Sequence, residues 1–219
     1  MKENFLLQIN SINGLEARFL NRVEGVEVDT DRLATVSRLE PFHRDAVEKM
    51  GFSWDQCWRA EQVHGKKVAI VRSGETAVTI TGVDGLISQD AGVVLGIYVA
   101  DCGAIYLADE VTGAFGLLHS GKKGTELGIL PRALAMMREE FGTKPENVRV
   151  ALSPCIRPPA YEVDFASEIK RQAMAAGVRD ENFTDSGICT SQDLEKYYSY
   201  RAEMGVTGRM LALLGKHER

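Results

Sequence analysis

Apolar side chains along this chain follow two patterns, one typical of buried strands and the other of amphipathic helices. Residues 93–100 are continuously apolar and rich in β-branched side chains, which predicts a strand buried on both faces. Shorter runs predict further strands at 57–60, 67–71, 148–152 and 209–214. Because no internal repeat or linker separates these segments, we expect one domain spanning residues 1–219.

Helical spacing is clearest at residues 127–141, where apolar residues recur at three- and four-residue steps. Gly142 is expected to end this helix, since glycine readily adopts the left-handed conformation found there. Pro131 lies inside the pattern, so the regular helix either begins near Ile129 or is kinked at the proline.

Three more helices are expected from capping and breaking residues. Pro41 can occupy the first position of a helix that ends at Gly51, and residues 29–31 can cap a separate short helix before it. After residue 163, Asp164 can cap a helix that ends near Gly177.

A β-hairpin is expected around the polar loop at residues 109–112, which separates two apolar runs. Pairing Ala108 with Gly113 across this loop places Cys102 directly opposite His119. Directly opposed side chains share one face, with Cβ atoms about 4.5–5.5 Å apart. Such a thiolate and imidazole can bind one metal ion or act as a nucleophile and its base. The alternative is a buried structural cysteine beside a hydrogen-bonded histidine.

The other histidines bear on a third ligand. His43 lies in a predicted helix beside charged residues and His217 in the polar C-terminal segment, so both are expected to be solvated. His64 lies at a strand edge or turn and completes a His, Cys, His set with Cys102 and His119. Three such ligands with one open position are typical of catalytic zinc. Copper is less expected, because four histidines are too few for a multicopper centre.

Composition excludes several classes of protein. The 219 residues are 44% hydrophobic and 26% charged, with a net charge of −5, which disfavours nucleic-acid binding and favours a small-molecule partner. The longest apolar run is far shorter than the ~20 residues that span a bilayer. No signal peptide is recognisable, and the four cysteines are dispersed, so we expect a cytoplasmic protein with reduced thiols and no membrane association.

Lys122 and Lys123 form a second candidate site, in a glycine-flanked turn before the helix at 127–141. Free backbone N–H groups and two ammonium groups there would bind a phosphate or carboxylate. The alternative is a solvated lysine pair on a surface turn.

Short motifs spread over the chain carry a resemblance to a known family. They are EQVHG (61–65), VDGLIS (83–88), ADC (100–102), HSGKKG (119–124), SPCI (153–156) followed by YEV (161–163), CT (189–190), SYR (199–201) and TGR (207–209). Their order is that of the laccase-domain family, also known as the multicopper polyphenol oxidase-like or YfiH-type proteins. The chain resembles this family from about Trp58 to its C-terminus.

This resemblance implies a single-domain α/β fold with layered mixed β-sheets flanked by helices, similar to a bacterial toxin deamidase fold. It implies a metal, usually taken to be zinc, bound by His64, Cys102 and His119. The implied activity is phosphorolysis of adenosine, inosine and methylthioadenosine, with adenosine deamination as a side activity. The family usually carries Trp-Arg where this chain has Lys122 and Lys123, so a guanidinium is replaced by an ammonium group.

Further roles follow if the chain has this activity. Phosphate is expected to bind Lys123 and the adjacent helix N-terminus, with Lys122 also contacting substrate and Arg201 or Arg209 assisting. Asp101, beside the ligand cysteine, is expected to shuttle protons during deamination.

Asp101 could instead accept a hydrogen bond from a ligating histidine. Tyr161 and Phe165 could stack on the purine, although aromatic residues in such segments are often part of the core.

Two other functions remain open from the residues. One is a metal-free cysteine hydrolase or amidase, with Cys102 as nucleophile and His119 as base, as in the toxin of similar fold. The other is a non-catalytic metal-binding scaffold. We expect the protein to be a monomer or homodimer.

Overall fold

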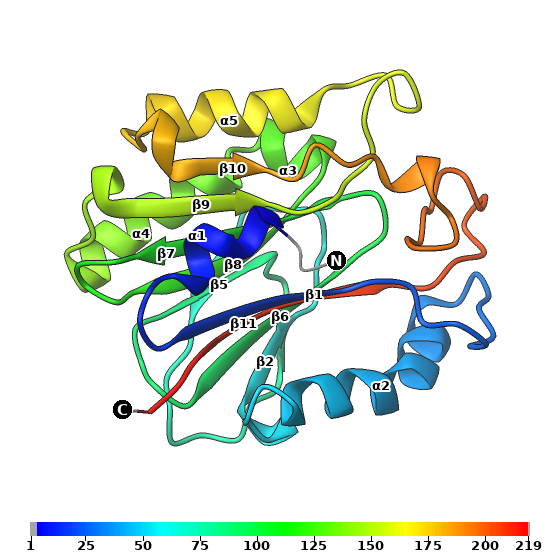
Figure 1. The fold of residues 1–219 in the computed structure, drawn as a ribbon, viewed down its shortest axis with the longest axis horizontal. Coiled ribbons are helices and arrows are strands. Elements are labelled where there is room, and N and C mark those ends of the chain that lie inside the picture. The colour runs from blue at the N-terminus through cyan, green and yellow to red at the C-terminus, as the bar shows by residue number, and fades with distance from the viewer. Residues whose placement is uncertain (1–3, 219) are drawn as a thin grey trace.

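The computed structural model describes residues 4–218 and consists of two mixed β-sheets packed face to face, with the longer helices on their outer sides (Figure 1). The five-stranded sheet has the order β1-β11-β6-β2-β4, and the six-stranded sheet has the order β10-β9-β7-β8-β5-β3. No helix among residues 4–218 is long and apolar enough to cross a membrane. The fold is therefore the mixed α/β type with layered sheets that was expected.

The strands of the five-stranded sheet are β1 (Leu15–Leu20), β2 (Cys57–Ala60), β4 (Thr79–Ile80), β6 (Val93–Val99) and β11 (Met210–Lys216). Those of the six-stranded sheet are β3 (Val68–Ile70), β5 (Gly85–Ser88), β7 (Gly103–Asp109), β8 (Phe115–Ser120), β9 (Val148–Leu152) and β10 (Phe183–Asp185). The helices are α1 (Leu7–Asn10), α2 (Arg32–Glu48), α3 (Lys122–Glu126), α4 (Ile129–Phe141) and α5 (Phe165–Ala175).

Three apolar clusters hold these layers together. The largest lies between the two sheets, a second lies between the six-stranded sheet and helices α4 and α5, and a third lies between α2 and the five-stranded sheet. Every residue of β6 is buried, as its continuous apolar run predicted. The chain leaves β6 at Ala100 and enters β7 at Gly103, so Asp101 and Cys102 lie in the tight connection between the two sheets.

Several helix and strand predictions are confirmed. β2, β9 and α4 occupy the expected segments, and Gly142 ends α4 in the left-handed conformation. Pro131 is the third residue of α4, where the helix has no intrahelical N–H bond to lose, so a kink is not needed. Asp164 caps α5 by accepting a hydrogen bond from the Ser167 N–H group.

The helices predicted on either side of Pro41 are wrong, because residues 32–48 form one helix, α2, with Pro41 inside it. Asp31 caps this helix by accepting the N–H groups of Leu33 and Ala34. An interior proline costs about 3 kcal/mol. Burial of Leu39, Val47 and neighbouring side chains on the face toward the sheet offsets that cost.

The predicted hairpin register is also wrong, by two residues. Ala108 pairs with Phe115 instead of Gly113, because the Asp109 carboxylate accepts the N–H groups of Val111 and Thr112 and the Asp109 N–H group bonds the Ala114 carbonyl, which moves the turn one residue along the chain. His119 is therefore opposite Ala104. A shift of two residues leaves every side chain on its original face, since side chains alternate with period two.

His43 contradicts the expectation that it is solvated. Its side chain is completely buried, and neither ring nitrogen has a hydrogen-bond partner among the described residues 4–218. The reason is that α2 places it against the five-stranded sheet, where its ring lies 5.5 Å from that of Tyr98. His217 is partly exposed, stacks on Phe52 and pairs with Glu16.

Candidate functional site

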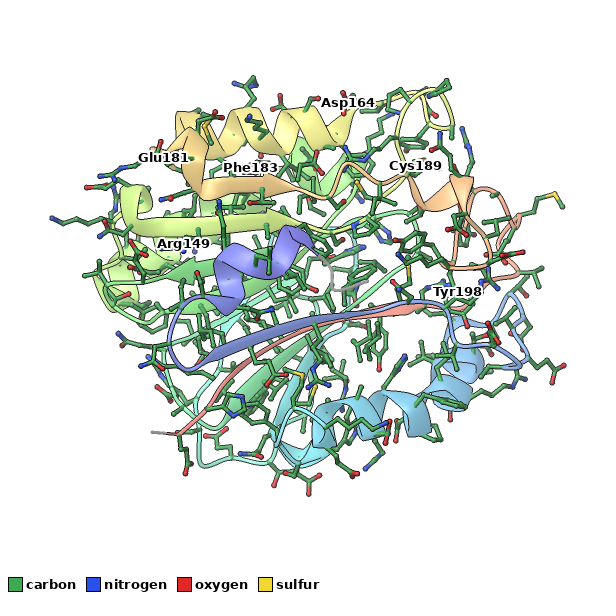
Figure 2. All side chains as sticks on the ribbon, viewed as in Figure 1. Arg149, Asp164, Glu181, Phe183, Cys189 and Tyr198 are labelled. Atoms are coloured by element: carbon green, nitrogen blue, oxygen red, sulfur yellow. The ribbon has the colours of Figure 1, made fainter. Side chains whose placement is uncertain are left out.

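A cavity of about 520 Å³ lies at one end of the two sheets. This is the end at which Cys189 and Tyr198 are labelled in Figure 2. Its lining falls into three groups, which are sulfur and nitrogen ligands, cations and aromatic rings. The ligand group is His64, Cys102 and His119; the cations are Arg32, Lys122, Arg201 and Arg209; the rings are Tyr98, Tyr161, Phe165 and Tyr200. Asp101 and Gln62 also line it.

His64, Cys102 and His119 converge at this cavity, each bringing one ligand atom within 4.8 Å of the others. His119 is buried at the end of β8, Cys102 is half-buried just before β7, and His64 is exposed on the loop after β2. The rings of His64 and His119 lie edge to face, with centroids 4.9 Å apart. This donor set, with one side open to the cavity, fits the chemistry of a catalytic zinc site.

Gly121 provides the space that the Cys102 thiol occupies. A Cβ atom built on Gly121 would lie 2.4 Å from the Cys102 Sγ atom, far inside van der Waals contact. Gly121 was not among the predicted site residues, although its place in the HSGKKG motif, directly after the strand of the ligand histidine, was the available signal.

The Asp84 carboxylate is the hydrogen-bond partner of the His119 ring, at 2.9 Å from Nδ1. Asp84 is completely buried, just before β5, and was not among the predicted site residues. Burial disfavours its charged form, but His119 and the N–H groups of His64 and Gly65 hold its pKa below the usual range. Asp84, and not Asp101, therefore accepts the hydrogen bond of a ligating histidine.

The loop after β2 has an unusual backbone. Gln62 and His64 both have positive φ, at 65° and 59°, which costs free energy for residues with a Cβ atom. The Gln62 side-chain amide bonds both the N–H and the C=O group of Tyr98, as a neighbouring strand would. These bonds anchor the segment that carries His64 to β6.

Cys102 and His119 have pKa values shifted toward their charged forms. Burial alone would raise the pKa of the thiol, but His119 and His64 lower it to about 6. Burial alone would lower the pKa of His119, but Cys102 and Asp84 raise it to about 9. The metal-free pair is thus a thiolate beside an imidazolium at neutral pH, and the thiolate is the form that binds metal.

Asp101 lies in the cavity wall with its carboxylate engaged by three donors. They are the hydroxyl groups of Thr190 and Ser199 and the N–H group of Arg201, each at 2.7 Å. Its φ of 80° is positive. Asp101 therefore joins the connection that bears Cys102 to two C-terminal segments that complete the cavity.

Arg32 and Arg209 face the cavity without a carboxylate partner among their hydrogen bonds and ion pairs in residues 4–218. Arg32 donates to the Glu61 carbonyl and the Gln62 side chain, and Arg209 donates to the carbonyls of Thr207 and Gly208. Burial and the nearby Arg32 charge lower the pKa of Arg209. Arg32 was missed because nothing in its local sequence distinguishes it from other helix-surface arginines.

The other predicted cations are placed differently. Lys122 lines the cavity at the start of α3, whereas Lys123 is exposed and is not part of the lining. The lysine pair therefore begins the short helix α3. The expectation that it directly precedes α4 is wrong. Arg201 is exposed and pairs with Glu162 at 2.9 Å.

The paired rings of Tyr161 and Phe165 form an aromatic wall of the cavity. Tyr161 and Phe165 were predicted there, and their rings lie edge to face at 6.1 Å. The Arg201 guanidinium lies 5.4 Å from the centre of the Tyr161 ring. Tyr98 and Tyr200 also line the cavity, and neither was predicted to.

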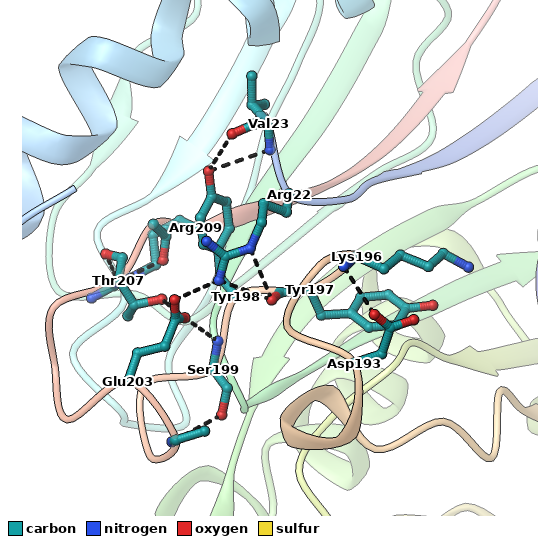
Figure 3. Close-up of polar contacts among 12 residues, drawn as sticks. Arg22, Val23, Asp193, Lys196, Tyr197, Tyr198, Ser199, Glu203, Thr207 and Arg209 are labelled. Carbon is teal, nitrogen blue, oxygen red and sulfur yellow. Dashed lines mark hydrogen bonds and ion pairs between the residues drawn. The ribbon is translucent and has the colours of Figure 1, made fainter. Parts of the chain in front are cut away.

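A hydrogen-bond network holds the C-terminal segment that carries Arg201 and Arg209 (Figure 3). The Glu203 carboxylate accepts bonds from Arg22, from the Ser199 N–H group and from the Thr207 hydroxyl. The Tyr198 hydroxyl bonds the backbone of Val23. This segment is therefore fixed to the strand end of β1 and presents its arginines to the cavity.

Comparison with known proteins places the chain among laccase-like sequences. The family model described as multi-copper polyphenol oxidoreductase laccase matches residues 30–169 and 163–217. The purine nucleoside phosphorylase YlmD of Geobacillus stearothermophilus is 30% identical over an alignment of 231 positions, which covers 89% of this chain and 83% of that protein. A purine nucleoside phosphorylase of Deinococcus radiodurans is 31% identical, covering 76% of this chain and 72% of that protein.

Solved structures share the fold. The crystal structure of YlmD from Geobacillus stearothermophilus superposes with a TM-score of 0.84 at 26% identity, covering 94% of this chain and 93% of that one. The Bacillus licheniformis hypothetical protein YfiH has a TM-score of 0.85 at 21% identity, with 95% of each chain covered.

Proposed function

The chain belongs to the multi-copper polyphenol oxidoreductase laccase family, and from this premise we propose that it is a metal-dependent purine nucleoside phosphorylase. The proposed substrates are adenosine, inosine and methylthioadenosine together with phosphate, with deamination of adenosine as a side activity. One observation carries the proposal. A His, Cys, His set lies in the same cavity as an aromatic wall and two arginines, Arg32 and Arg209, that have no carboxylate partner within residues 4–218.

His64, Cys102 and His119 are the residues that would hold the metal, and zinc is the metal this donor set suits. When bound, zinc supplies Lewis acidity at the reacting centre. The thiolate form of Cys102 supports this assignment, as does the engagement of His119 Nδ1 by Asp84, which leaves Nε2 as the ring nitrogen for a metal.

Phosphate is proposed to bind the cationic side of the cavity. Arg32 and Arg209 can both donate to one phosphate, and guanidinium groups suit its geometry. Lys122 and Arg201, at the cavity edge, and Lys123, one residue further along, are proposed to add positive charge. Together they would hold the phosphate nucleophile in the cavity beside the nucleoside.

The purine is proposed to stack on the aromatic wall, where Tyr161 and Phe165 offer ring faces or edges. Asp101 is proposed to move the proton during deamination. Its carboxylate is held at the cavity wall by Thr190, Ser199 and the Arg201 N–H group, which fixes its oxygen atoms beside the ligand Cys102.

Incubation of the zinc-loaded protein with adenosine, with and without phosphate, tests the proposal when adenine and inosine are resolved by chromatography. We expect adenine and ribose 1-phosphate only with phosphate, and a smaller yield of inosine in both conditions. Arg32→Ala should raise the KM for phosphate at least ~10-fold, the effect of losing one charged hydrogen-bonding partner. Arg132→Ala, at an exposed position of α4, is the matched control. Absence of any product would favour the scaffold function instead.

A second candidate is the metal-free cysteine hydrolase, which the thiolate–imidazolium pair of Cys102 and His119 favours. Metal analysis of the purified protein separates the two functions. Stoichiometric zinc that is lost in His64→Ala would contradict the hydrolase, whereas metal-free protein that is rapidly alkylated at Cys102 would support it.

A further inference from the structure

Asp84 contacts both of the segments that carry the histidine ligands, through its side chain and through its backbone. The carboxylate accepts the His119 Nδ1–H group at 2.9 Å and the His64 N–H group at 2.8 Å, both at Oδ1. The backbone carbonyl of Asp84 also accepts the His119 N–H group at 2.7 Å. One fully buried residue thus connects β8 with the loop after β2.

The bond to His119 decides which ring nitrogen can bind a metal. A carboxylate accepts a proton donor, so Nδ1 of His119 carries hydrogen, and Nε2 is the ring nitrogen left to bind a metal once it gives up its own proton. Carboxylates in this position fix the tautomer and orientation of ligating histidines and increase their basicity.

The bonds to the loop hold His64 by its backbone. The Asp84 carboxylate accepts three consecutive N–H groups, those of Val63, His64 and Gly65. The positive φ of His64 would otherwise be unfavourable, and these bonds offset its cost. A Cβ atom on Gly65 would lie only 3.3 Å from Asp84 Oδ2, so the carboxylate and the loop fit closely at this point.

We propose that Asp84 is the positioning residue for both imidazole ligands, setting the tautomer of His119 through its ring and the place of His64 through its backbone. This role rests on the proposed metal site. It assigns to Asp84 a control of metal affinity that His64, an exposed residue on a loop, could not supply by itself.

Asp84→Asn tests the role, because it keeps the size of the side chain but puts an NH₂ group where an N–H donor now points. We expect zinc affinity, measured by competition with a chromophoric chelator, to fall about 10–100-fold. Nitrogen-15 NMR of labelled histidine should show His119 bound to zinc through Nε2 with Nδ1 protonated in the wild type. In Asp84→Asn the same spectrum should show a mixture of tautomers.

Asp109→Asn is the matched control. Asp109 is equally buried and also accepts backbone N–H groups, at the opposite end of β7, but it touches no ligand. It should lower the melting temperature and leave zinc affinity unchanged. If it weakens zinc as much as Asp84→Asn does, a general loss of stability explains both and the inference is overturned.

Gly65→Ala provides a second test that leaves the carboxylate in place, should Asp84→Asn not fold. It should crowd Oδ2 and weaken zinc binding severalfold without altering the His119 tautomer. Unchanged affinity in both Asp84→Asn and Gly65→Ala would overturn the inference alone. Absence of zinc binding by the wild type would overturn the proposed metal site, and the inference with it.

Discussion

His43 and His119 are both buried in this protein, yet their surroundings drive their pKa values in opposite directions. His43 has no hydrogen-bond partner, and burial lowers its pKa to about 4. For His119 burial acts in the same direction, but Cys102 and Asp84 reverse it and raise the pKa to about 9. The difference shows that burial alone does not set the charge of a histidine, because a specific anionic partner outweighs it.

Their locations match these properties. His43 lies between α2 and the five-stranded sheet, where it fills space beside Tyr98. His119 lies at the end of a strand of the other sheet and faces the cavity. A neutral histidine in the core contributes packing, whereas a charged or metal-bound histidine at a cavity can take part in binding and catalysis.

The largest expected effect comes from removing the partner that distinguishes His119. Cys102→Ala should lower phosphorolysis at least ~100-fold, since loss of even an outer partner of a metal ligand costs 10–100-fold. The pKa of His119 in the metal-free protein should also fall, and NMR titration of the ring measures it. Activity close to that of the wild type would show that the His, Cys, His set is not the reacting centre.

Lowering the pH should destabilise the fold through His43. Above pH 6.5 His43 is neutral in both the folded and the unfolded protein and adds no pH dependence. As the pH falls from 6.5 to 4, only the unfolded chain binds a proton, so stability decreases by up to about 3 kcal/mol. Urea denaturation at pH 7, 5.5 and 4.5 measures this loss.

His43→Leu should remove that acid sensitivity and stabilise the fold at pH 7 by about 1 kcal/mol, because it replaces unsatisfied polar atoms with apolar ones. His43→Leu should leave zinc affinity and activity unchanged, in contrast to Cys102→Ala. If the same loss of stability on acidification persists in His43→Leu, other groups are its source.

The smallest effect is expected at His217, which pairs with Glu16 while its side chain is 39% exposed. Glu16→Gln removes this contact and the ion pair of Glu16 with Arg18, and it should change stability by less than about 1 kcal/mol, as is usual for partly exposed ion pairs. Denaturation at low and high salt checks this, and a larger loss would contradict it.

Local patterns in the sequence predicted those parts of the fold that depend on local physics. The apolar run of β6 and the Gly142 cap of α4 are examples, since burial on both faces and a left-handed glycine have distinct signatures. The hairpin register failed because the Asp109 side chain, not the loop length, decides where the strands pair. Pro41 failed because tertiary packing of α2 outweighs its local preference.

The convergence of His64, Cys102 and His119 was predictable, because histidine and cysteine are the side chains that typically bind zinc. Asp84, Arg32 and Gly121 were not singled out, because their importance comes from contacts between segments far apart in the sequence. His43 was misplaced for the same reason. Its charged neighbours in the sequence point away from the sheet that it packs against.

The Gln62 side chain that imitates a strand has a consequence for hydrogen exchange. Amide protons in a central strand usually exchange only when the whole protein unfolds. The N–H group of Tyr98 lies in β6 but is bonded to a side chain, not to β2, which has already ended. This proton can exchange whenever the bond to the Gln62 side chain breaks. The exchange rate of the Tyr98 amide, alone in the core of the sheet, therefore reports how often the loop that carries His64 opens.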